Sequence, residues 1–321
     1  GSRPSALVPS GPVGLVVQKF GGLTAGPAGA AVKTAGPVDA RGSVEQVYVV
    51  GGFQGISTDK DITTLGRGGS DTTAVALAAA LRAEACAIDT AVSGGFTADP
   101  RIVPKAHKLS KVSYDEMLEM AATGGRVLAL RSVEFARNYG VPVHVRSSFT
   151  WEPGTWVAQE DPSMEQAIVS GVTHETAEAK VTISRVPDEP GVAARLFRRL
   201  ADSEINVDMI VQNVSTDGHT DISFTVPEVD LVRTLQVAEE IATSVGASGV
   251  AADPDIARVS IVGAGMRTNP GVAATMFEVL ADEGVNIEMI STSTIRTSCV
   301  VRAADVERAA QALHSAFGLD A

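Results

Sequence analysis

Aromatic residues and cysteines are scarce in this chain of 321 residues: 4% are aromatic and two are cysteine. Cys86 and Cys299 lie far apart in the sequence, so they do not suggest a disulfide framework and indicate reduced thiols in a cytoplasmic protein. The five histidines are scattered without the spacing of metal ligands, and we expect no metal site built by the protein alone.

Basic residues are also few, since 26 Lys and Arg stand against 38 Asp and Glu, for a net charge of −12. A nucleic-acid or acidic-membrane partner would need a clustered basic face, so we expect neither partner. No apolar run is long enough to span a bilayer, and no signal peptide is evident. With 45% hydrophobic residues, the chain can fill about two or three domains.

What the chain does have is a glycine-rich stretch at 63–74 (TTLGRGGSDTTA) that runs directly into an apolar segment, Val75–Arg82. A turn that opens into a helix leaves backbone N–H groups unpaired, and these favour an anion. Arg67 adds a planar fork for a carboxylate or phosphate, and Ser70 or Asp71 can cap the helix. The alternative is an ordinary strand–turn–helix corner without a ligand.

Strands alternate with helices over the first half of the chain, which predicts a mainly parallel sheet covered on both faces. The expected strands are 13–22, 44–52, 85–92 and 141–147, and the expected helices are 70–84, 113–121 and 128–139. Lys19 stands near the end of the first strand, where it can meet a phosphate or simply be solvated. Residues 22–41 read as a loop with no packed element, and Trp156–Glu165 reads as a linker.

A second glycine turn at 93–101 (SGGFTADPR) follows the third expected strand. Arg101 could bind phosphates there. Phe96 could stack on a base, although core packing is the simpler reading of that side chain.

An internal repeat occupies the second half of the chain. Residues 188–210 align without gaps on residues 268–290, with about half the positions identical at an offset of about 80 residues. Strands are expected before and after each copy, and a helix closes it. The unit is therefore a ferredoxin-like α/β sandwich.

The motifs together resemble those of aspartokinases, in the same order. They are VQKFGG at 17–22, GFQG at 52–55, TLGRGGSDTTA at 64–74, TADPR at 97–101 and LRS at 130–132. The repeat resembles the tandem ACT modules of that family, through PGVA at 190–193, INVDMI at 205–210 and QNVS at 212–215.

This resemblance implies an α/β fold in which an amino-acid-kinase-like, mainly parallel sheet, sandwiched by helices but truncated, precedes two ferredoxin-like ACT modules. The boundaries expected are 1–12 for a tag remnant or disordered tail, 13–156 for a kinase-like domain lacking part of its usual N-terminal half, 157–174 for a linker with a strand shared with the ACT pair, 175–250 for the first module and 251–321 for the second.

The resemblance also implies transfer of the γ-phosphoryl group of ATP, with Mg²⁺, to the side-chain carboxylate of L-aspartate or a related amino acid. Lys19 and Asp71 would be catalytic, and Arg67, Gly69 and Ser70 would bind the substrate. The nucleotide-binding residues would be Gly21, Gly22, Thr90, Phe96, Arg101 and Arg126.

Lysine or threonine would bind the ACT modules as feedback effectors. The candidate ligands are Asp188, Gly191, Asn206, Asp208, Gln212, Asn213, Gly271, Asn286 and Glu288, which offer acidic and amide groups to an amino acid. The alternative for the Pro-Gly turns is a plain loop-to-helix corner. Assembly as a homodimer or higher oligomer through the ACT modules is expected, and a partner kinase subunit is a further option.

Several positions depart from the family pattern. Leu23 and Thr24 replace two serines, Ala91 and Ser93 replace two acids, and a long stretch before Gly52 is lacking. These departures fall at the active site, whereas the ACT motifs are retained. Three readings therefore stay open: a kinase of aspartate or of another amino-acid carboxylate, a catalytically degenerate amino-acid sensor, and an unrelated chemistry in a remodelled pocket.

Overall fold

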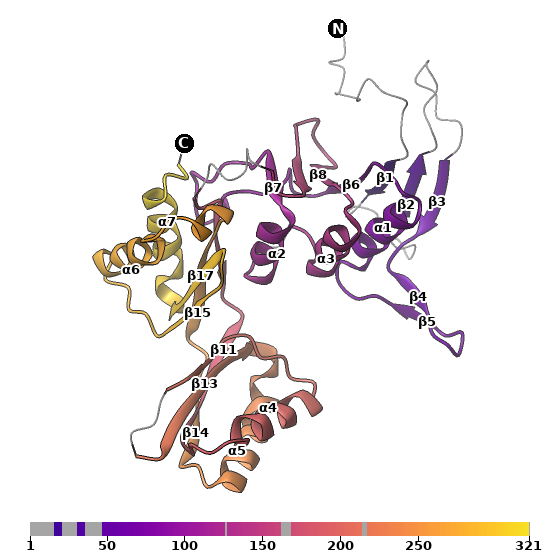
Figure 1. Ribbon diagram of the computed structural model, residues 1–321. Coiled ribbons are helices and arrows are strands. Elements are labelled where there is room, and N and C mark those ends of the chain that lie inside the picture. Colours follow the sequence, from indigo (N-terminus) through magenta and orange to yellow (C-terminus); the bar gives the residue numbers. More distant parts are fainter. Residues whose placement is uncertain are drawn as a thin grey trace. The chain divides into compact units, whose positions relative to one another are not determined.

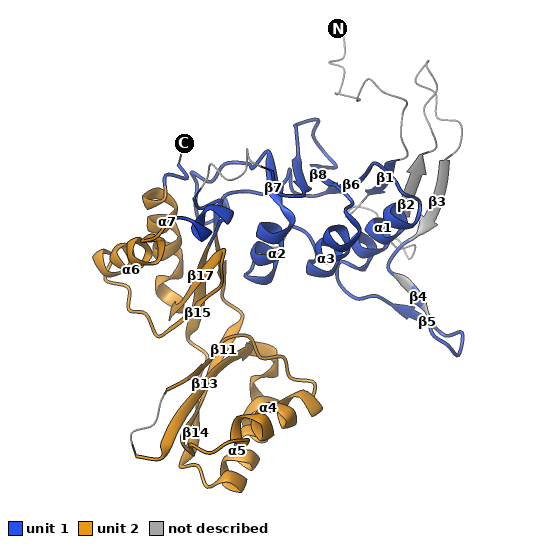
Figure 2. Ribbon diagram, in the orientation of Figure 1, with its two compact units in different colours: residues 1–171, 262–269, 318–321 blue, residues 172–261, 270–317 orange. Residues whose placement is uncertain are grey.

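The computed structural model describes residues 16–20, 31–35, 47–125, 127–161, 168–213 and 217–320. They fall into two compact units, coloured separately in Figure 2. Unit 1 comprises residues 1–171, 262–269 and 318–321, and unit 2 comprises residues 172–261 and 270–317. Gly21, Gly22, Arg126 and the expected tail 1–12 lie outside the described residues.

Unit 1 is built on a sheet with the strand order β3-β2-β1-β6-β8-β9-β7. Its strands are β1 (Val16–Phe20), β2 (Ala31–Ala35), β3 (Val47–Gly51), β6 (Ala85–Thr90), β7 (Lys111–Ser113), β8 (Val143–Ser147) and β9 (Thr155–Ala158). The central strands β1, β6 and β8 run parallel, whereas β1–β2, β2–β3 and β8–β9 are antiparallel pairs. The parallel centre confirms the expected α/β class. A separate hairpin joins β4 (Gln54–Ile56) and β5 (Ile62–Thr64).

Two segments read from the sequence as loop or linker are strands. Within residues 22–41, β2 pairs with both β1 and β3, so the expectation of no packed element was wrong. Trp156 lies in β9, which pairs with β7 and β8. Both strands are short, at five and four residues, so neither shows a clear alternation on its own. Their neighbours in the sheet supply the pairing that local pattern does not reveal.

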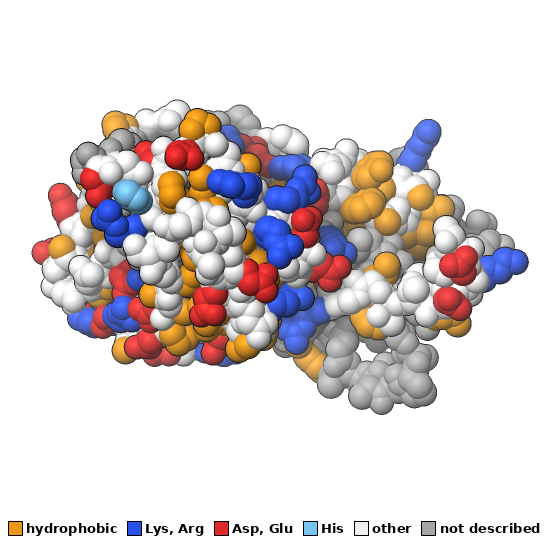
Figure 3. All heavy atoms as spheres, turned by 90° about the horizontal axis from the view of Figure 1, so that it is seen from below, with side chains coloured by type: hydrophobic (Ala, Val, Ile, Leu, Met, Phe, Trp, Pro, Cys, Tyr) orange, Lys and Arg blue, Asp and Glu red, His pale blue; other side chains and the backbone are white. Residues whose placement is uncertain are grey.

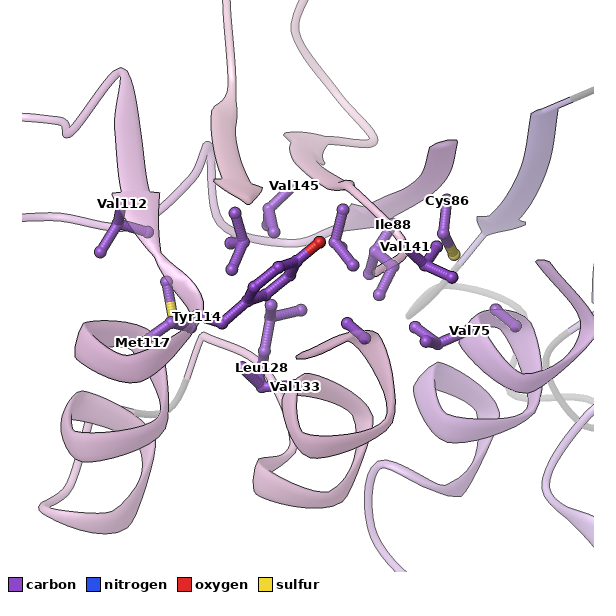
Figure 4. Packing of buried hydrophobic residues seen from close by; sticks show 14 of the residues in the cluster. Val75, Cys86, Ile88, Val112, Tyr114, Met117, Leu128, Val133, Val141 and Val145 are labelled. Carbon is purple, nitrogen blue, oxygen red and sulfur yellow. The ribbon is translucent and has the colours of Figure 1, made fainter. Parts of the chain in front are cut away.

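The three helices of unit 1 are α1 (Gly69–Ala80), α2 (Tyr114–Ala122) and α3 (Leu130–Tyr139), as expected from the apolar spacing. They lie on one face of the sheet (Figure 1). Buried side chains of the sheet and of the helices pack together there (Figure 4). Ile88 and Val145 from the strands meet Val75, Tyr114 and other residues from the helices in one buried cluster. Within the described residues, no helix covers the other face of this sheet, although helices were expected on both.

Unit 2 contains the two copies of the repeat, each with a four-stranded sheet and two helices. The first sheet has the order β12 (Ile210–Gln212), β13 (His219–Pro227), β11 (Glu178–Pro187), β14 (Gly249–Asp253). The second has the order β10 (Gly171–Glu175), β15 (Ile256–Val262), β17 (Arg296–Arg302), β16 (Met289–Thr292). The helices are α4 (Val192–Asp202), α5 (Leu231–Val245), α6 (Val272–Asp282) and α7 (Val306–Ala316), with short 3₁₀ turns η1 (Glu228–Asp230) and η3 (Ala303–Asp305). A third such turn, η2 (Ala264–Arg267), belongs to unit 1.

The two copies exchange their edge strands. β10 directly precedes β11 in the chain but pairs with β15 of the other sheet, and β14 precedes β15 but pairs with β11. Each sheet therefore includes a strand that lies next to the other copy in the sequence. Buried Met209, Ile256, Met289 and Val300 form a small apolar cluster drawn from both copies. We infer that neither copy completes its sheet alone.

Acidic and basic side chains are interspersed on the face of the molecule shown in Figure 3. Ion pairs at the surface of the described residues include Arg199 with Glu240 at 3.1 Å. Among the described residues, no helix is both long and apolar enough to cross a membrane.

Candidate functional site

The glycine-rich turn forms a tight entry into α1. Gly66 and Gly68 have φ angles of 75° and 74°, in the left-handed region that glycine tolerates. A Cβ atom on Gly68 would lie 2.3 Å from the Cβ of Ala129, so the turn packs closely on the segment before α3. Both observations explain why glycines stand here.

The helix cap differs from the expectation. Gly68 is the N-cap of α1 and no side chain caps it, so the prediction that Ser70 or Asp71 would do so was wrong. The backbone closes the turn itself, because Gly69 N–H donates to Gly66 and Asp71 N–H donates to Gly68. Ser70 and Asp71 lie inside the first helical turn, and their side chains remain available for other contacts.

Lys19 of β1 and Asp71 of α1 meet at the centre of unit 1. Lys19 Nζ lies 2.8 Å from Asp71 Oδ1, and the two residues are only 8% and 9% exposed. The contact is an ion pair without the alignment of a good hydrogen bond. Neighbouring Cys86 is an unreactive thiol, because burial, and to a smaller extent Asp71, raises its pKa to about 12.

Arg67 stands at the start of the same turn and is exposed to solvent. It makes no hydrogen bond or ion pair that the structure shows with another described residue, so its guanidinium is available to an anion. Arg67, Gly69 and Ser70 are thus gathered at one helix terminus, where the helix dipole also favours negative charge.

The described residues among the expected nucleotide-binding set do not share one environment. Thr90 ends β6, and its carbonyl accepts a hydrogen bond from Ser148 N–H at 2.8 Å. Phe96 is half-buried and forms an isolated bridge with Lys108. The Arg101 side chain is 84% exposed and already forms an ion pair with Asp99 at 2.6 Å. Arg101 would have to leave that carboxylate to bind a phosphate.

A polar row on the sheet was not anticipated from the sequence. Asp89 is 4% exposed in β6, and it accepts hydrogen bonds from Gln18 at 2.6 Å and from Arg146 at 3.1 Å. The signal was an acid inside the otherwise apolar strand 85–90, next to the motif that contains Lys19.

Glu116 anchors a second buried network that the sequence only partly indicated. Ser113 and Glu116 form a capping box at the start of α2. The Glu116 carboxylate also accepts from Ser170 Oγ at 2.6 Å and from Ala264 N–H at 3.0 Å. It therefore joins the start of α2 to two distant segments of unit 1. No local pattern could reveal partners so remote in the chain.

The effector candidates in unit 2 lie at equivalent places in the two copies. Gly191 and Gly271 are left-handed N-caps of α4 and α6, with φ angles of 95° and 97° and no side-chain cap. Most of the remaining candidates are exposed to solvent, namely Asp188, Asn206, Gln212, Asn213 and Asn286. The structure shows few contacts of these side chains with other described residues.

Asp208 and Glu288, by contrast, are already paired with cations across the two copies. Arg258 of β15 binds Asp208, and Lys180 of β11 binds Glu288. Lys180 and Arg258 occupy matching positions in the repeated strands (AKVTI and ARVSI). These reciprocal ion pairs hold the copies together, so an effector ammonium group would have to compete with Arg258 or Lys180.

Glu178 is an acidic residue near Arg258 that has no acidic counterpart in the second copy. It lies 2.8 Å from Arg258, but burial raises its pKa to about 7 despite that neighbour. The matching position of the second copy holds buried Ile256.

Fold and site together define an amino-acid-kinase-type domain joined to paired ACT modules. The family model for the amino acid kinase family matches residues 38–147, and that for the ACT domain matches residues 182–241 and 259–317. Among curated proteins, the aspartokinase of Pseudomonas aeruginosa is 51% identical over 86% of this chain and 68% of its own length. The aspartokinase of Mycolicibacterium smegmatis is 54% identical over 85% of this chain.

Solved structures agree. The Clostridium acetobutylicum aspartate kinase has a TM-score of 0.74 at 27% identity, covering 83% of this chain and 62% of that one. E. coli aspartokinase III, solved with aspartate and ADP, has a TM-score of 0.71 at 29% identity, covering 83% of this chain and 59% of that one. The chain belongs to the aspartokinase family. It spans 66% of the length of the Mycolicibacterium smegmatis protein.

Proposed function

We propose that this protein transfers the γ-phosphoryl group of ATP to the side-chain carboxylate of L-aspartate. The observation that carries the proposal is the buried Lys19–Asp71 ion pair beside a helix terminus at which Arg67 has no partner among the described residues. Phosphoryl transfer needs positioning and positive charge more than covalent chemistry, and this arrangement offers both. The aspartokinase of E. coli that resembles this chain was solved with aspartate and ADP.

In this proposal, Lys19 faces the transferred phosphoryl group and Asp71 fixes its position. Asp71 need not accept a proton, because a substrate carboxylate is already ionised at neutral pH. Arg67 binds the substrate α-carboxylate, and the N–H groups around Gly69 and Ser70 complete the anion site.

Mg²⁺ would accompany the nucleotide. No group of three His, Cys, Asp or Glu side chains suited to a metal occurs among the described residues. The ion would therefore be held chiefly by phosphate oxygens and water, which is common for Mg²⁺.

The ACT modules would bind lysine or threonine and inhibit the kinase half. No side chain caps α4 at Gly191 or α6 at Gly271, so backbone N–H groups of the first turns can donate to a carboxylate, while Asp188 and the exposed amides can bind an ammonium group. E. coli aspartokinase III was solved with lysine as well as aspartate.

We also propose self-association through unit 2. Ile210 and Ile290, at matching positions on the edge strands β12 and β16, are 51% and 45% exposed. Exposed apolar edges favour pairing with another chain. The unbridged, buried Cys86 and Cys299 support a reducing, cytoplasmic setting.

A second candidate is a catalytically degenerate sensor that regulates a partner kinase. Ala91 and Ser93 favour it, because no carboxylate stands at either position to assist nucleotide or metal binding. The ion pair of Arg101 with Asp99 also favours the sensor, because it occupies a guanidinium expected to bind phosphates.

ADP release measured with L-aspartate, and separately with other amino-acid carboxylates, decides between these candidates. The kinase proposal predicts ADP release that depends on aspartate and is reduced by lysine or threonine. ADP release with a different amino acid, and not with aspartate, would show that this other amino acid is the substrate. Absence of release with every amino acid, together with a rise in melting temperature on adding lysine or threonine, would support the sensor.

A further inference from the structure

Asp89 is a buried carboxylate near the carboxyl end of β6. In the parallel sheet it lies in register with Phe20 of β1 and Arg146 of β8. Ile88 and Val145, one residue earlier on each strand, point towards the helices in Figure 4. Because side chains alternate along a strand, Asp89 and Arg146 lie on the opposite face of the sheet.

Both oxygens of Asp89 are engaged. Gln18 Nε2 donates to Oδ2 at 2.6 Å, and Arg146 Nε donates to Oδ1 at 3.1 Å. These hydrogen bonds offset the cost of burying the charge of Asp89, and the bond to Nε fixes the orientation of the Arg146 guanidinium. The Arg146 side chain is nevertheless 35% exposed, and the structure shows no bond from its terminal nitrogens to another described residue.

Arg146 is placed where a ligand would bind. It is the next-to-last residue of β8, and Lys19 is the next-to-last residue of β1 in the same parallel sheet. The carboxyl ends of parallel strands border the ligand crevice of α/β sheets. The hydrogen bond between Ser148 N–H and the Thr90 carbonyl ties the ends of β8 and β6 together at this edge.

Three other cations of unit 1, one on β1 and two in the segment that follows β6, are already engaged, whereas Arg67 is not. Lys19 is paired with Asp71, Arg101 with Asp99, and Lys108 with Glu152. His144, on the same face of β8 as Arg146, stacks on Trp156 at 4.1 Å. Burial, followed by the charge of Arg146, lowers the pKa of His144 to about 4, so this imidazole is neutral near pH 7.

We propose that Arg146, oriented by Asp89, binds the phosphate chain of the nucleoside triphosphate. This inference rests on the proposed phosphoryl transfer. An arginine presents donors in a planar fork that suits phosphate oxygens, and Asp89 and Gln18 hold that fork before the ligand arrives. Arg146 touches the ligand, whereas Asp89 is a positioning residue that acts through it.

The competing explanation is that Arg146 only neutralises buried Asp89. Calorimetric titration of ADP into the full chain separates the two, with the melting temperature recorded for each variant. Arg146→Gln, Arg146→Lys and Asp89→Asn are compared with Arg137→Gln. Arg137 is a matched control, because it is an exposed arginine of unit 1 that also pairs with a carboxylate, that of Asp115 at 3.1 Å.

Arg146→Gln should weaken ADP binding by about ten- to a hundredfold, the value of a lost hydrogen-bond partner to a charged group. Arg146→Lys should recover part of the affinity, because lysine keeps the charge but lacks the fork. Asp89→Asn should weaken binding less than Arg146→Gln, and Arg137→Gln should leave it unchanged.

A lower melting temperature with ADP affinity within about twofold of the wild type, which is about 0.4 kcal/mol, would overturn the inference and assign Arg146 a purely structural role. If Arg146→Gln does not fold, Arg146→Met decides, since it also removes the charge and unchanged affinity there has the same meaning. A wild-type chain that binds no ADP would overturn the proposed function and this inference together.

Discussion

Glu178 should make the stability of unit 2 depend on pH in an unusual direction. Glu178 is 8% exposed, and burial raises its pKa from 4.5 to about 7. The folded protein therefore holds a proton on Glu178 at pH values where the unfolded chain has lost it. Stability contributed by this group is complete below pH 4.5 and is lost as the pH rises through about 7.

The size of this effect follows from the two pKa values. At about 1.4 kcal/mol for each pH unit, the change from pH 4.5 to 7 amounts to about 3 kcal/mol. The value of about 7 already includes the opposing effect of the Arg258 guanidinium, which lies 2.8 Å away. Glu178→Gln keeps the shape of the side chain and removes the proton equilibrium.

Urea unfolding at pH 5, 6, 7 and 8 (about the range between the two pKa values) tests this prediction. We expect the free energy of unfolding of the wild type, relative to Glu178→Gln, to fall as the pH rises. His144 titrates with the opposite sign, because its pKa is lowered from 6.5 to about 4, but it is common to both proteins and cancels in the difference. Glu228→Gln, at an exposed position, is the control. Parallel pH profiles for wild type and Glu178→Gln would refute the reasoning.

Three further predictions follow from single residues. Gly68→Ala should destabilise unit 1 by at least about 1–2 kcal/mol, because its φ is 74° and the new Cβ would meet Ala129; an unchanged urea midpoint would contradict this. Glu116→Ala should lower the melting temperature more than Glu116→Gln does, because it leaves buried donors without an acceptor, at a cost of about 1–3 kcal/mol each. Equal melting temperatures of the two variants would show that the hydrogen bonds of Glu116 contribute little to stability. Asp188→Asn should weaken calorimetric binding of lysine or threonine without changing the melting temperature of the free protein, and unaltered binding would remove Asp188 from the effector site.

Long, strongly patterned elements were predictable from the sequence. Helices 114–122 and 130–139 lie within about two residues of the expected ranges, which is the usual uncertainty at helix ends. The repeat at 188–210 and 268–290 revealed paired modules because each copy repeats the same apolar spacing around the same Pro-Gly turn. Short strands such as β2 escaped prediction, because their pairing depends on neighbours distant in the chain.

Residue types at the site were easier to predict than residue partners. The proximity of Lys19 and Asp71 follows from packing α1 against β1, which a family motif can indicate but spacing alone cannot. No local sequence pattern indicates that β10 and β14 are exchanged between the two copies. The same holds for the ion pairs that Asp208 and Glu288 form with cations of the other copy. Such contacts arise only once both sheets are formed.

Trapping the acyl phosphate product with hydroxylamine tests the central claim most directly. The wild-type chain should form aspartyl hydroxamate only when ATP and L-aspartate are both present. Lys19→Met, which leaves Asp71 without its ion-pair partner, should lower the rate by at least about a hundredfold, as the loss of one charge-stabilising donor does in other enzymes. No hydroxamate from the wild type, or an undiminished rate in Lys19→Met, would contradict the account.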